Sequence, residues 1–474
     1  MRRTDPSDGH EQPVNRDAYS GAPKPGRLRP ELWGGIECSV VRVGGTIRNQ
    51  VVETGHHLRD DDLSRIAELG IRTLRYPVVW ETVSPRHAEE DGWAWHDERL
   101  LRMRQLSLEP ILGLVHHGSG PGYGQLLGGN FAEGLALHAR RVAERYPWVR
   151  CYTPVNEPLT TARFSALYGF WHPHLRDHDA FLRAVFEQCM ATVLAMSAIK
   201  TINSDATLVT TEDMGRCFST PRLSYQADYE NERRWLSLDL LCGRVDPHHP
   251  FHQPLIRAGI TASELAYMRD REPVVDVIGI NHYLTSDRYL DERLSLFPPA
   301  SHGGNGRESY ADFEAFRSIL NDEDLGPSAR LAEVWQRYRL PIAVTEVHNG
   351  APPEEQVRWL MEVWEAAGEL LSRGADVRAV TVWSIFGAVD WNSLLTKAEG
   401  SYENGVFDVR GDNVEPTLLT DAVTALASTG HWDHPVLREP GWWRRPQRIC
   451  PSLHQQASYF RPVSAGAGVN MRSG

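Results

Sequence analysis

The stretch VRCYTPVNE, residues 149–157, is a short, largely apolar run that ends on two polar residues. A run of this length and composition is typical of a strand buried on both faces, as in a parallel sheet. Its last two residues are Asn156 and Glu157, and Pro158 follows them. In a barrel of parallel strands, residues at the carboxyl ends of the strands surround the active site. The stretch therefore predicts a strand that brings an amide and a carboxylate to one site.

Seven more apolar runs of this kind alternate with segments of helical spacing. The runs cover residues 32–40, 71–80, 108–117, 206–214, 274–284, 341–349 and 377–387. Amphipathic segments between them include residues 61–70, 131–146, 179–202 and 354–374. Eight strands alternating with helices predict an α/β fold, specifically a (β/α)8 TIM barrel. An open doubly wound sheet is the competing architecture, but no G-x-G-x-x-G follows the first strand, so the barrel is favoured.

The barrel is expected to form one domain over residues 30–435, because barrels with long loops run past about 400 residues as single domains. Residues 1–29 are polar and rich in proline and glycine, which predicts a disordered N-terminal tail. Residues 436–474 contain GWWRRPQR and end in SAGAGVNMRSG. We expect a partly disordered C-terminal extension there, with one segment that adheres to the barrel.

Composition argues against several classes of partner. The net charge is −12 and no cluster of lysine or arginine stands out, so a nucleic acid partner is not expected. The N-terminal segment has no apolar core for secretion and no run is long enough to cross a bilayer, which predicts a cytoplasmic protein without a membrane partner. The six cysteines are far apart and lack C-x-x-C spacing, which favours reduced thiols.

Histidine pairs raise the question of a metal site. They occur at residues 56–57, 116–117 and 248–249. Adjacent histidines point in different directions, and none of them shows the H-E-x-x-H spacing of a zinc site. We therefore predict no metal and no organic cofactor.

A second carboxylate, Glu346, ends the predicted seventh strand in AVTEVHNG. In a ring of eight strands, the fourth and seventh lie on roughly opposite walls, so Glu157 and Glu346 can face each other. Two opposed carboxylates are what glycoside hydrolysis requires. Asn156 could then hydrogen-bond a ring hydroxyl beside the acid. Glutamates at strand ends also form salt bridges around a barrel rim, and for one glutamate alone that interpretation would be preferred.

At these residues the chain resembles glycoside hydrolase family 1, the β-glucosidase family, over about residues 31–430. The family's N-E-P signature matches residues 156–158, which implies Glu157 as the general acid/base. Its T-E-N-G signature is matched more loosely by residues 345–350, TEVHNG, with two residues inserted after the glutamate. This match implies Glu346 as the nucleophile.

Four other segments resemble the family as well: LRYPVVW, GLVHHG, GINHY and VWSIFGAVDW. They imply Arg75 beside the nucleophile, His116 on a sugar hydroxyl, Tyr283 bonded to the nucleophile and Trp383 beneath the sugar ring. Arg75 and Tyr283 are then expected to lower the pKa of Glu346. A drier setting is expected to raise the pKa of Glu157.

Two departures from the family pattern fall on the sugar pocket. An ungapped alignment places Val41 where the family has a glutamine that grips sugar hydroxyls. Asp390 precedes Trp391 where the family has a longer glutamate, and both residues are expected to bind substrate. The chain is therefore identified as a divergent member of the family, and the resemblance supports the type of reaction better than the identity of the sugar that is bound. Glu37, Glu212 and Asp213 also lie near strand ends and are further candidates.

The resemblance implies a retaining β-glycoside hydrolase that acts on a small-molecule O-glycoside through a covalent glycosyl-enzyme intermediate. One alternative is transglycosylation in specialised-metabolite or deoxysugar chemistry, which would use the same residues. Another is a sugar-binding barrel without catalysis. A metal-dependent barrel hydrolase is a more distant alternative. The sequence predicts no particular glycone, aglycone or oligomeric state.

Overall fold

The computed structural model describes residues 28–450 and residue 453. Nearly all of the predicted N-terminal tail, and most of the C-terminal extension from residue 451 onward, lie outside the described residues.

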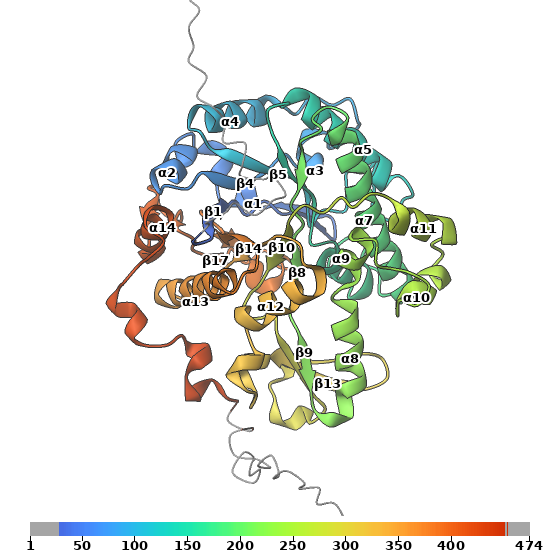
Figure 1. Ribbon diagram of the computed structural model, residues 1–474, viewed down its shortest axis with the longest axis vertical. Coiled ribbons are helices and arrows are strands. Elements are labelled where there is room, and N and C mark those ends of the chain that lie inside the picture. Colours follow the sequence, from blue (N-terminus) through green and yellow to red (C-terminus); the bar gives the residue numbers. More distant parts are fainter. Residues whose placement is uncertain (1–27, 451–452, 454–474) are drawn as a thin grey trace, which may run out of the picture.

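A ring of parallel strands forms the centre of the molecule (Figure 1). The strands are β1 (Glu31–Gly35), β4 (Thr73–Pro77), β5 (Glu109–His116), β6 (Cys151–Asn156), β7 (Thr207–Leu208), β8 (Glu212–Asp213), β10 (Ile278–Asn281), β14 (Ile342–Val347) and β15 (Val377–Val382). Their order is β7-β6-β5-β4-β1-β15-β14-β10-β8.

The two ends of this strand order belong to one stretch of chain, because β7 and β8 are the two halves of the predicted fifth strand. β7 pairs with β6, β8 pairs with β10, and a bridge between Val209 and Val277 lies between these pairings. The stretch therefore closes the sheet on itself. Each barrel strand overlaps one of the eight predicted runs, and the (β/α)8 prediction is confirmed.

Helices surround the ring of strands (Figure 1). Those that follow barrel strands include α2 (Asp62–Glu68), α4 (Ala94–Gln105), α5 (Phe131–Arg145), α7 (His178–Lys200), α12 (Pro327–Tyr338), α13 (Pro353–Ser372) and α14 (Leu418–Ser428). In α13 the buried residues include Val357, Leu360, Trp364 and Ala367, a spacing of three and four that places one apolar stripe against the barrel. The four predicted helical segments coincide with α2, α5, α7 and α13.

Shorter elements lie in the loops that join strands and helices. The helices among them are α1 (Gln50–Glu53), α3 (Trp80–Val83), α6 (Pro158–Ala162), α8 (Ser224–Arg233), α9 (Leu236–Leu241), α10 (His252–Arg257) and α11 (Ala262–Asp270). Three small hairpins are β2 (Val40–Val43) with β3 (Thr46–Asn49), β16 (Ala388–Val389) with β17 (Tyr402–Glu403), and β18 (Phe407–Asp408) with β19 (Glu415–Pro416).

A second sheet of four strands stands beside the barrel and carries α8 at the lower end of the view in Figure 1. Its strands, in order, are β12 (His302–Gly304), β13 (Ser309–Glu314), β11 (Arg288–Asp291) and β9 (Cys217–Ser219). They come from the segments that follow the fifth and sixth barrel strands.

Apolar side chains fill the barrel interior. A buried cluster draws residues from seven of the eight strand positions: Trp33, Ile111, Cys151, Val209, Val277, Ala343 and Ala379. Layers of this kind make the inside of a (β/α)8 barrel a packed core, so ligands bind at its open carboxyl-terminal face.

The helix α7 is long and apolar enough to cross a membrane by length and composition alone. However, 67% of its most apolar window is buried inside the protein, and it packs against α5 and β6. Its hydrophobicity is thus accounted for by contacts with the barrel.

Part of the predicted C-terminal extension packs on the barrel. Trp443 is fully buried, and its ring lies 5.4 Å from that of Trp359 in α13. Its Nε1 donates a hydrogen bond of 2.7 Å to Glu362. The GWWRRPQR segment therefore adheres to the outside of the helical layer.

Candidate active site

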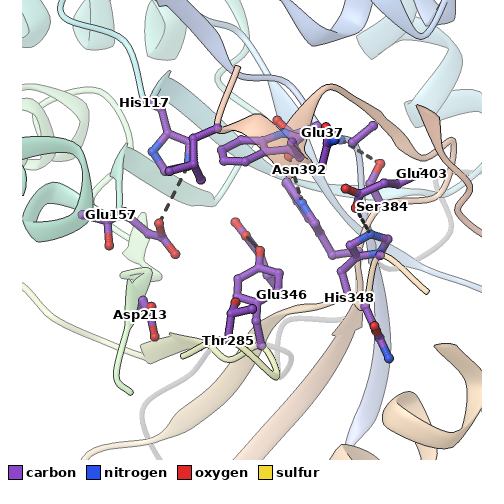
Figure 2. A pocket seen from close by; sticks show the side chains of 18 of the residues that line it. Glu37, His117, Glu157, Asp213, Thr285, Glu346, His348, Ser384, Asn392 and Glu403 are labelled. Atoms are coloured by element: carbon purple, nitrogen blue, oxygen red, sulfur yellow. Dashed lines mark hydrogen bonds and ion pairs between the residues drawn. The ribbon is translucent and has the colours of Figure 1, made fainter. Parts of the chain in front are cut away.

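A cavity of about 440 Å³ opens at the carboxyl ends of the strands, and both predicted catalytic carboxylates line it. Figure 2 shows Glu157 and Asp213 on one side of Glu346, with His348 and Glu403 on the other. These side chains come from strand ends or from the loops that follow them. The predicted pairing of the fourth and seventh strands at one site is thus present in the fold.

Glu346 is held by two donors. It lies in β14 with 2% of its surface exposed, and Arg75 Nη1 donates a hydrogen bond of 2.8 Å to its Oε1. The hydroxyl of Tyr283 donates to its Oε2. Arg75 Nη2 also donates to Asn156 Oδ1 at 2.7 Å, so residues from the second, fourth and seventh predicted strands form one hydrogen-bond network. Two donors on two oxygens hold the carboxylate plane in a single orientation.

The electrostatics of Glu346 correct one expectation. Burial raises the pKa of Glu346, and the charge of Arg75 and the hydroxyl of Tyr283 lower it only in part. The prediction of a pKa below the ordinary value was wrong because it left out the desolvation of a completely buried carboxyl group. The two partners nevertheless have the predicted positions and the predicted sign of effect.

Glu157 follows β6 directly, in the left-handed backbone region with φ of 45°, and only 5% of it is exposed. Asn281 Nδ2 donates a hydrogen bond of 2.7 Å to its Oε1. Burial, the charge of Glu346 and then the charges of Asp213 and Glu212 raise the pKa of Glu157 well above its ordinary value. Glu157 is therefore favoured as a protonated acid, whereas Glu346 has a guanidinium that favours its charged form.

His117 lies next to the acid. Its Nε2 is 3.7 Å from Glu157 Oε2, and Asn156 Nδ2 is 3.3 Å from the same nitrogen. Burial and the charge of Arg75 lower the pKa of His117 to about 3. The imidazole is therefore neutral and does not draw the proton away from Glu157.

Glu212 holds the turn that carries the acid. It is fully buried, and its carboxyl group accepts hydrogen bonds from Leu159 N at 2.9 Å and Ser237 Oγ at 2.7 Å. Thr160 N lies within 3.4 Å of its other oxygen. Burial raises the pKa of Glu212 to about 7. Glu212 thus fixes the start of α6 immediately after Glu157.

Trp383 lines the cavity, and Glu37 lies beside it. The indole Nε1 donates a hydrogen bond of 3.1 Å to Glu37 Oε2. The ring lies against β1 at Gly35, where a Cβ would stand only 2.3 Å from Trp383 Cε3. Glycine is therefore required at this point of β1, because any side chain there would displace the indole from the cavity wall.

His116 does not line the cavity, and its contact with a sugar hydroxyl stays a prediction. Its ring stacks on Trp383 with centroids 5.5 Å apart and an interplanar angle of 7°, which places it behind the indole. Its Nε2 accepts from Asn156 at 3.2 Å, and its Nδ1 lies 3.3 Å from Cys38 Sγ. The residues that line the cavity do not include His116, Arg75 or Asn156. These three residues therefore support the cavity wall from behind.

Asp390 also differs from the prediction. It has 1% of its surface exposed and lies outside the cavity lining. Arg48 Nη2 donates to its Oδ2 at 2.9 Å, and the Ser401 amide donates to its Oδ1 at 2.7 Å. The carboxylate is thus engaged by Arg48 rather than facing a sugar. Trp391, the next residue, does line the cavity.

Replacing Asp390 by asparagine is expected to reduce the free energy of unfolding by about 1–3 kcal/mol, the range for losing a buried charge-assisted hydrogen bond. Urea unfolding measures this loss. Glu399→Gln, an exposed carboxylate of the same loop, should leave the free energy of unfolding unchanged. A raised KM for a glycoside without any loss of stability would instead assign Asp390 to substrate binding.

Val41 is buried with Trp171 and Leu395 in a small apolar cluster. This agrees with the expectation that no amide is presented from that position. Glu37, four residues before Val41, supplies a carboxyl group to the active-site cavity.

Several residues of the site were not singled out from the sequence. Asn281 ends β10 as Asn156 ends β6, so the strand-end rule that found Asn156 could have found it. His348 lies in the two-residue insertion after Glu346, and its Nε2 is 2.8 Å from Glu403 Oε2. Glu403 comes from β17, and no pattern in the sequence connects it with the barrel strands.

Among residues 28–450 and 453, no group of three or more His, Cys, Asp and Glu side chains is arranged to hold a metal ion. The sequence-based expectation of a reaction without metal or cofactor stays a prediction.

Comparisons with known proteins agree with this geometry. The model of glycosyl hydrolase family 1 matches residues 42–402. Beta-glucosidase 4 of Oryza sativa subsp. japonica is 26% identical over 470 residues, which cover 86% of this chain and 92% of that protein. The aryl-phospho-beta-D-glucosidase BglC of Bacillus subtilis is 22% identical over 393 residues, covering 73% and 80% of the two chains.

A solved structure is similar as well. The beta-glucosidase from Thermotoga maritima in complex with deoxynojirimycin superposes with a TM-score of 0.68 and covers 87% of this chain and 100% of its own. At 15% sequence identity, this likeness concerns the fold. The family model, in contrast, spans most of the chain and includes both strand-end glutamates. The protein is therefore a member of glycoside hydrolase family 1.

Proposed function

We propose that the protein is a retaining β-glycosidase that cleaves an O-glycoside through a covalent glycosyl-enzyme intermediate. The observation that carries this proposal is the unequal setting of the two buried carboxyl groups. Arg75 and Tyr283 contact Glu346, whereas the strongest charge effects on Glu157 come from carboxyl groups. A nucleophile and an acid need this contrast at the same pH.

In the first step, Glu157 donates its proton to the glycosidic oxygen as the bond from that oxygen to the anomeric carbon breaks. Glu346 attacks the anomeric carbon from the other face and forms an ester. Arg75 and Tyr283 hold the attacking carboxylate in place, which reduces the entropic cost of reaching the reactive geometry. Asn281 holds the acid through its hydrogen bond to Glu157 Oε1.

In the second step, a water molecule takes the position of the departed alcohol. Glu157, now a carboxylate, removes a proton from this water while the oxygen attacks the anomeric carbon and releases Glu346. The pKa of Glu157 is raised in part by the charge of Glu346. Esterification removes that charge, so Glu157 is ionised more readily in the intermediate, where it serves as a base.

The substrate class follows from the relatives by analogy. These relatives include a beta-glucosidase, an aryl-phospho-beta-D-glucosidase and a 6-phospho-beta-galactosidase. We propose that the substrate is a small β-glycoside with an aryl or alkyl leaving group. The cytoplasmic location stays a prediction.

The test is the intact mass of the protein after incubation with 2-deoxy-2-fluoro β-glycosides that carry good leaving groups. We expect a gain of one fluoroglycosyl unit with at least one sugar, because the fluorine slows both formation and hydrolysis of the ester, whereas the good leaving group speeds only its formation. Glu346→Ala should show no gain, whereas Glu157→Gln should still be labelled, since a good leaving group needs little protonation. Sugar binding by calorimetry without any adduct would favour the sugar-binding barrel.

A further inference from the structure

Arg163 reaches the cavity from the same segment as the acid. α6 (Pro158–Ala162) begins directly after Glu157, and a single π-helical turn, η2 (Arg163–Leu167), continues it. Arg163 is the first residue of this turn, and its side chain lines the cavity. π-helical turns inside helices occur frequently at functional sites.

The guanidinium of Arg163 has no acceptor. Among the described residues, none accepts a hydrogen bond from its side chain, and no carboxylate oxygen lies within 4 Å to form an ion pair. Its Nε is buried without a partner. The rings of Phe164 and Tyr168 lie beside the guanidinium, with centroids 5.6 and 5.9 Å from Cζ. An arginine is always charged and has five N–H donors, so this side chain retains unused binding capacity.

Such an arrangement is unusual for an enclosed position. Buried or half-buried charges are ordinarily paired, because an unpaired donor loses its hydrogen bonds to water without replacement. Of the three guanidinium nitrogens, only Nε is both buried and without a partner. The two terminal nitrogens also lack a partner in the described part of the chain but are accessible, and Arg163 lines the cavity, so they face its open space. The guanidinium therefore presents its fork to a ligand.

The position of Arg163 is on the leaving-group side. The acid of a glycosidase protonates the leaving oxygen, so the leaving group lies beside Glu157. Although burial opposes its charge, neighbouring tyrosine and carboxyl groups, Glu157 among them, raise the pKa of Arg163. Arg163 follows Glu157 by six residues through α6, so it lies on the same segment as the acid.

Apolar groups complete this wall of the cavity. Phe164, Trp391 and Leu394 line it together with Arg163. Flat apolar walls suit an aromatic ring, and a guanidinium fork suits the planar geometry of a carboxylate.

We propose that Arg163 binds the carboxylate of an aromatic acid that forms the leaving group, so that the preferred substrates are β-glycosides of phenolic acids. This inference rests on the proposed function, because it assigns the leaving group of the same site. Carboxyl groups in the cavity lining oppose a bound anion. Among them, Asp213 raises the pKa of Arg163 and accepts a hydrogen bond of 3.0 Å from the Gly215 amide. Asp213 repels an anion, so removing its charge should strengthen the preference for a carboxylate, whereas removing the charge of Arg163 should weaken it.

The kinetic test compares the β-glycosides of 3-hydroxybenzoic acid and 3-hydroxybenzamide, with the glycone identified by mass labelling. For the wild type and each variant, kcat/KM for the acid glycoside is divided by kcat/KM for the amide glycoside. The two leaving groups differ in intrinsic reactivity, but this difference is the same for every protein and does not affect the comparison of ratios. We expect Arg163→Gln to lower this ratio about 10- to 100-fold, the range for one charge-assisted contact. Arg163→Lys should retain part of the ratio, and Asp213→Asn should raise it.

Two controls accompany this comparison. Arg257→Gln, on an exposed position of α10, should leave the ratio unchanged. Raising the ionic strength should lower the ratio in the wild type but not in Arg163→Gln, because salt screens the attraction between Arg163 and the carboxylate. An equal ratio in wild type and Arg163→Gln would overturn the proposal.

A binding measurement separates this inference from the proposed function. Calorimetry with free 3-hydroxybenzoate and 3-hydroxybenzamide on the full chain needs no turnover. We expect the acid to bind about 10-fold more tightly than the amide in the wild type and equally in Arg163→Gln. This result without any hydrolysis would contradict the glycosidase proposal alone. Hydrolysis of the amide glycoside without any preference for the acid would contradict the Arg163 proposal alone.

Discussion

Replacing Glu346 by alanine is expected to lower kcat for aryl β-glycosides by on the order of 10⁵-fold, because the covalent route needs this carboxylate and only binding and proton donation remain. Steady-state kinetics with 4-nitrophenyl glycosides measures the loss. Glu346→Gln should lose as much activity while its amide oxygen still accepts from Arg75 and its amide nitrogen donates to the Tyr283 hydroxyl. Equal losses in the two variants would exclude misfolding as the cause.

Chemical rescue identifies the lost role. Azide fits the space that the alanine variant leaves and attacks the anomeric carbon from the face that Glu346 occupied. The bond to the leaving oxygen breaks, Glu157 protonates that oxygen, and an α-glycosyl azide forms. Tyr283→Phe serves as a control, because it removes one donor from Glu346 and leaves the nucleophile in place, and it should lose about 10- to 100-fold without responding to azide. Rescue that yields the β-glycosyl azide would contradict the assignment of Glu346.

The barrel could be predicted from the sequence because its evidence is local. Each parallel strand is buried on both faces, so it appears as a continuous apolar run, and each covering helix shows its own periodicity. The second sheet could not be predicted in this way. In this sheet β11 pairs with β9 and with β13, so that Arg288 lies opposite both Cys217 and Glu314. The strands of the sheet are short and half-exposed, and they carry no distinct sequence pattern.

For the site, the same local rule found the residues at the strand ends and missed those that depend on distant contacts. Glu157 and Glu346 follow buried strands, and the barrel geometry brings them together without further information. Asp390 instead depends on Arg48, a residue 342 positions away that lies in the β2–β3 hairpin. No spacing along the chain indicates that this pair forms.

The pKa of Glu346 shows a similar limit. From the sequence, the nearby positive charge could be inferred and gave the correct sign for that contribution. The degree of burial comes from the packed loops above the barrel, and burial proves to be the larger effect. Arg163 was missed for the opposite reason, since its significance is the lack of a partner, and a sequence does not show which contacts are absent.

Replacing Glu157 by glutamine is expected to have an effect that depends on the leaving group. For poor leaving groups such as alkyl alcohols, kcat/KM should fall by about 10²- to 10⁴-fold, the usual contribution of a general acid. For 2,4-dinitrophenyl glycosides, kcat/KM should change little, because that leaving group departs without protonation. The glycosyl-enzyme should then accumulate, since Glu157 is also the base that activates water. Azide should accelerate its breakdown and yield a β-glycosyl azide.

The pH profile of kcat/KM provides the second readout. Burial and the charge of Glu346 raise the pKa of Glu157, and the first step needs its protonated form, so activity should fall as the pH rises through this raised pKa. This alkaline limb should lie above the ordinary glutamate pKa of about 4.3 and should be absent in Glu157→Gln. Glu212→Gln removes one of the charges that raise the pKa of Glu157, so it should move the limb to lower pH.

These two results together separate the acid from its neighbours. Glu212 holds the turn after Glu157 through its contacts with Leu159 and Ser237. If this structural support were its only role, Glu212→Gln would lower activity equally at every pH and would not move the alkaline limb. A shifted limb in Glu212→Gln together with an absent limb in Glu157→Gln requires that the titrating group be Glu157. An alkaline limb that persists unchanged in Glu157→Gln would assign the proton donor to another group in the cavity, and the retaining mechanism would then lose its acid.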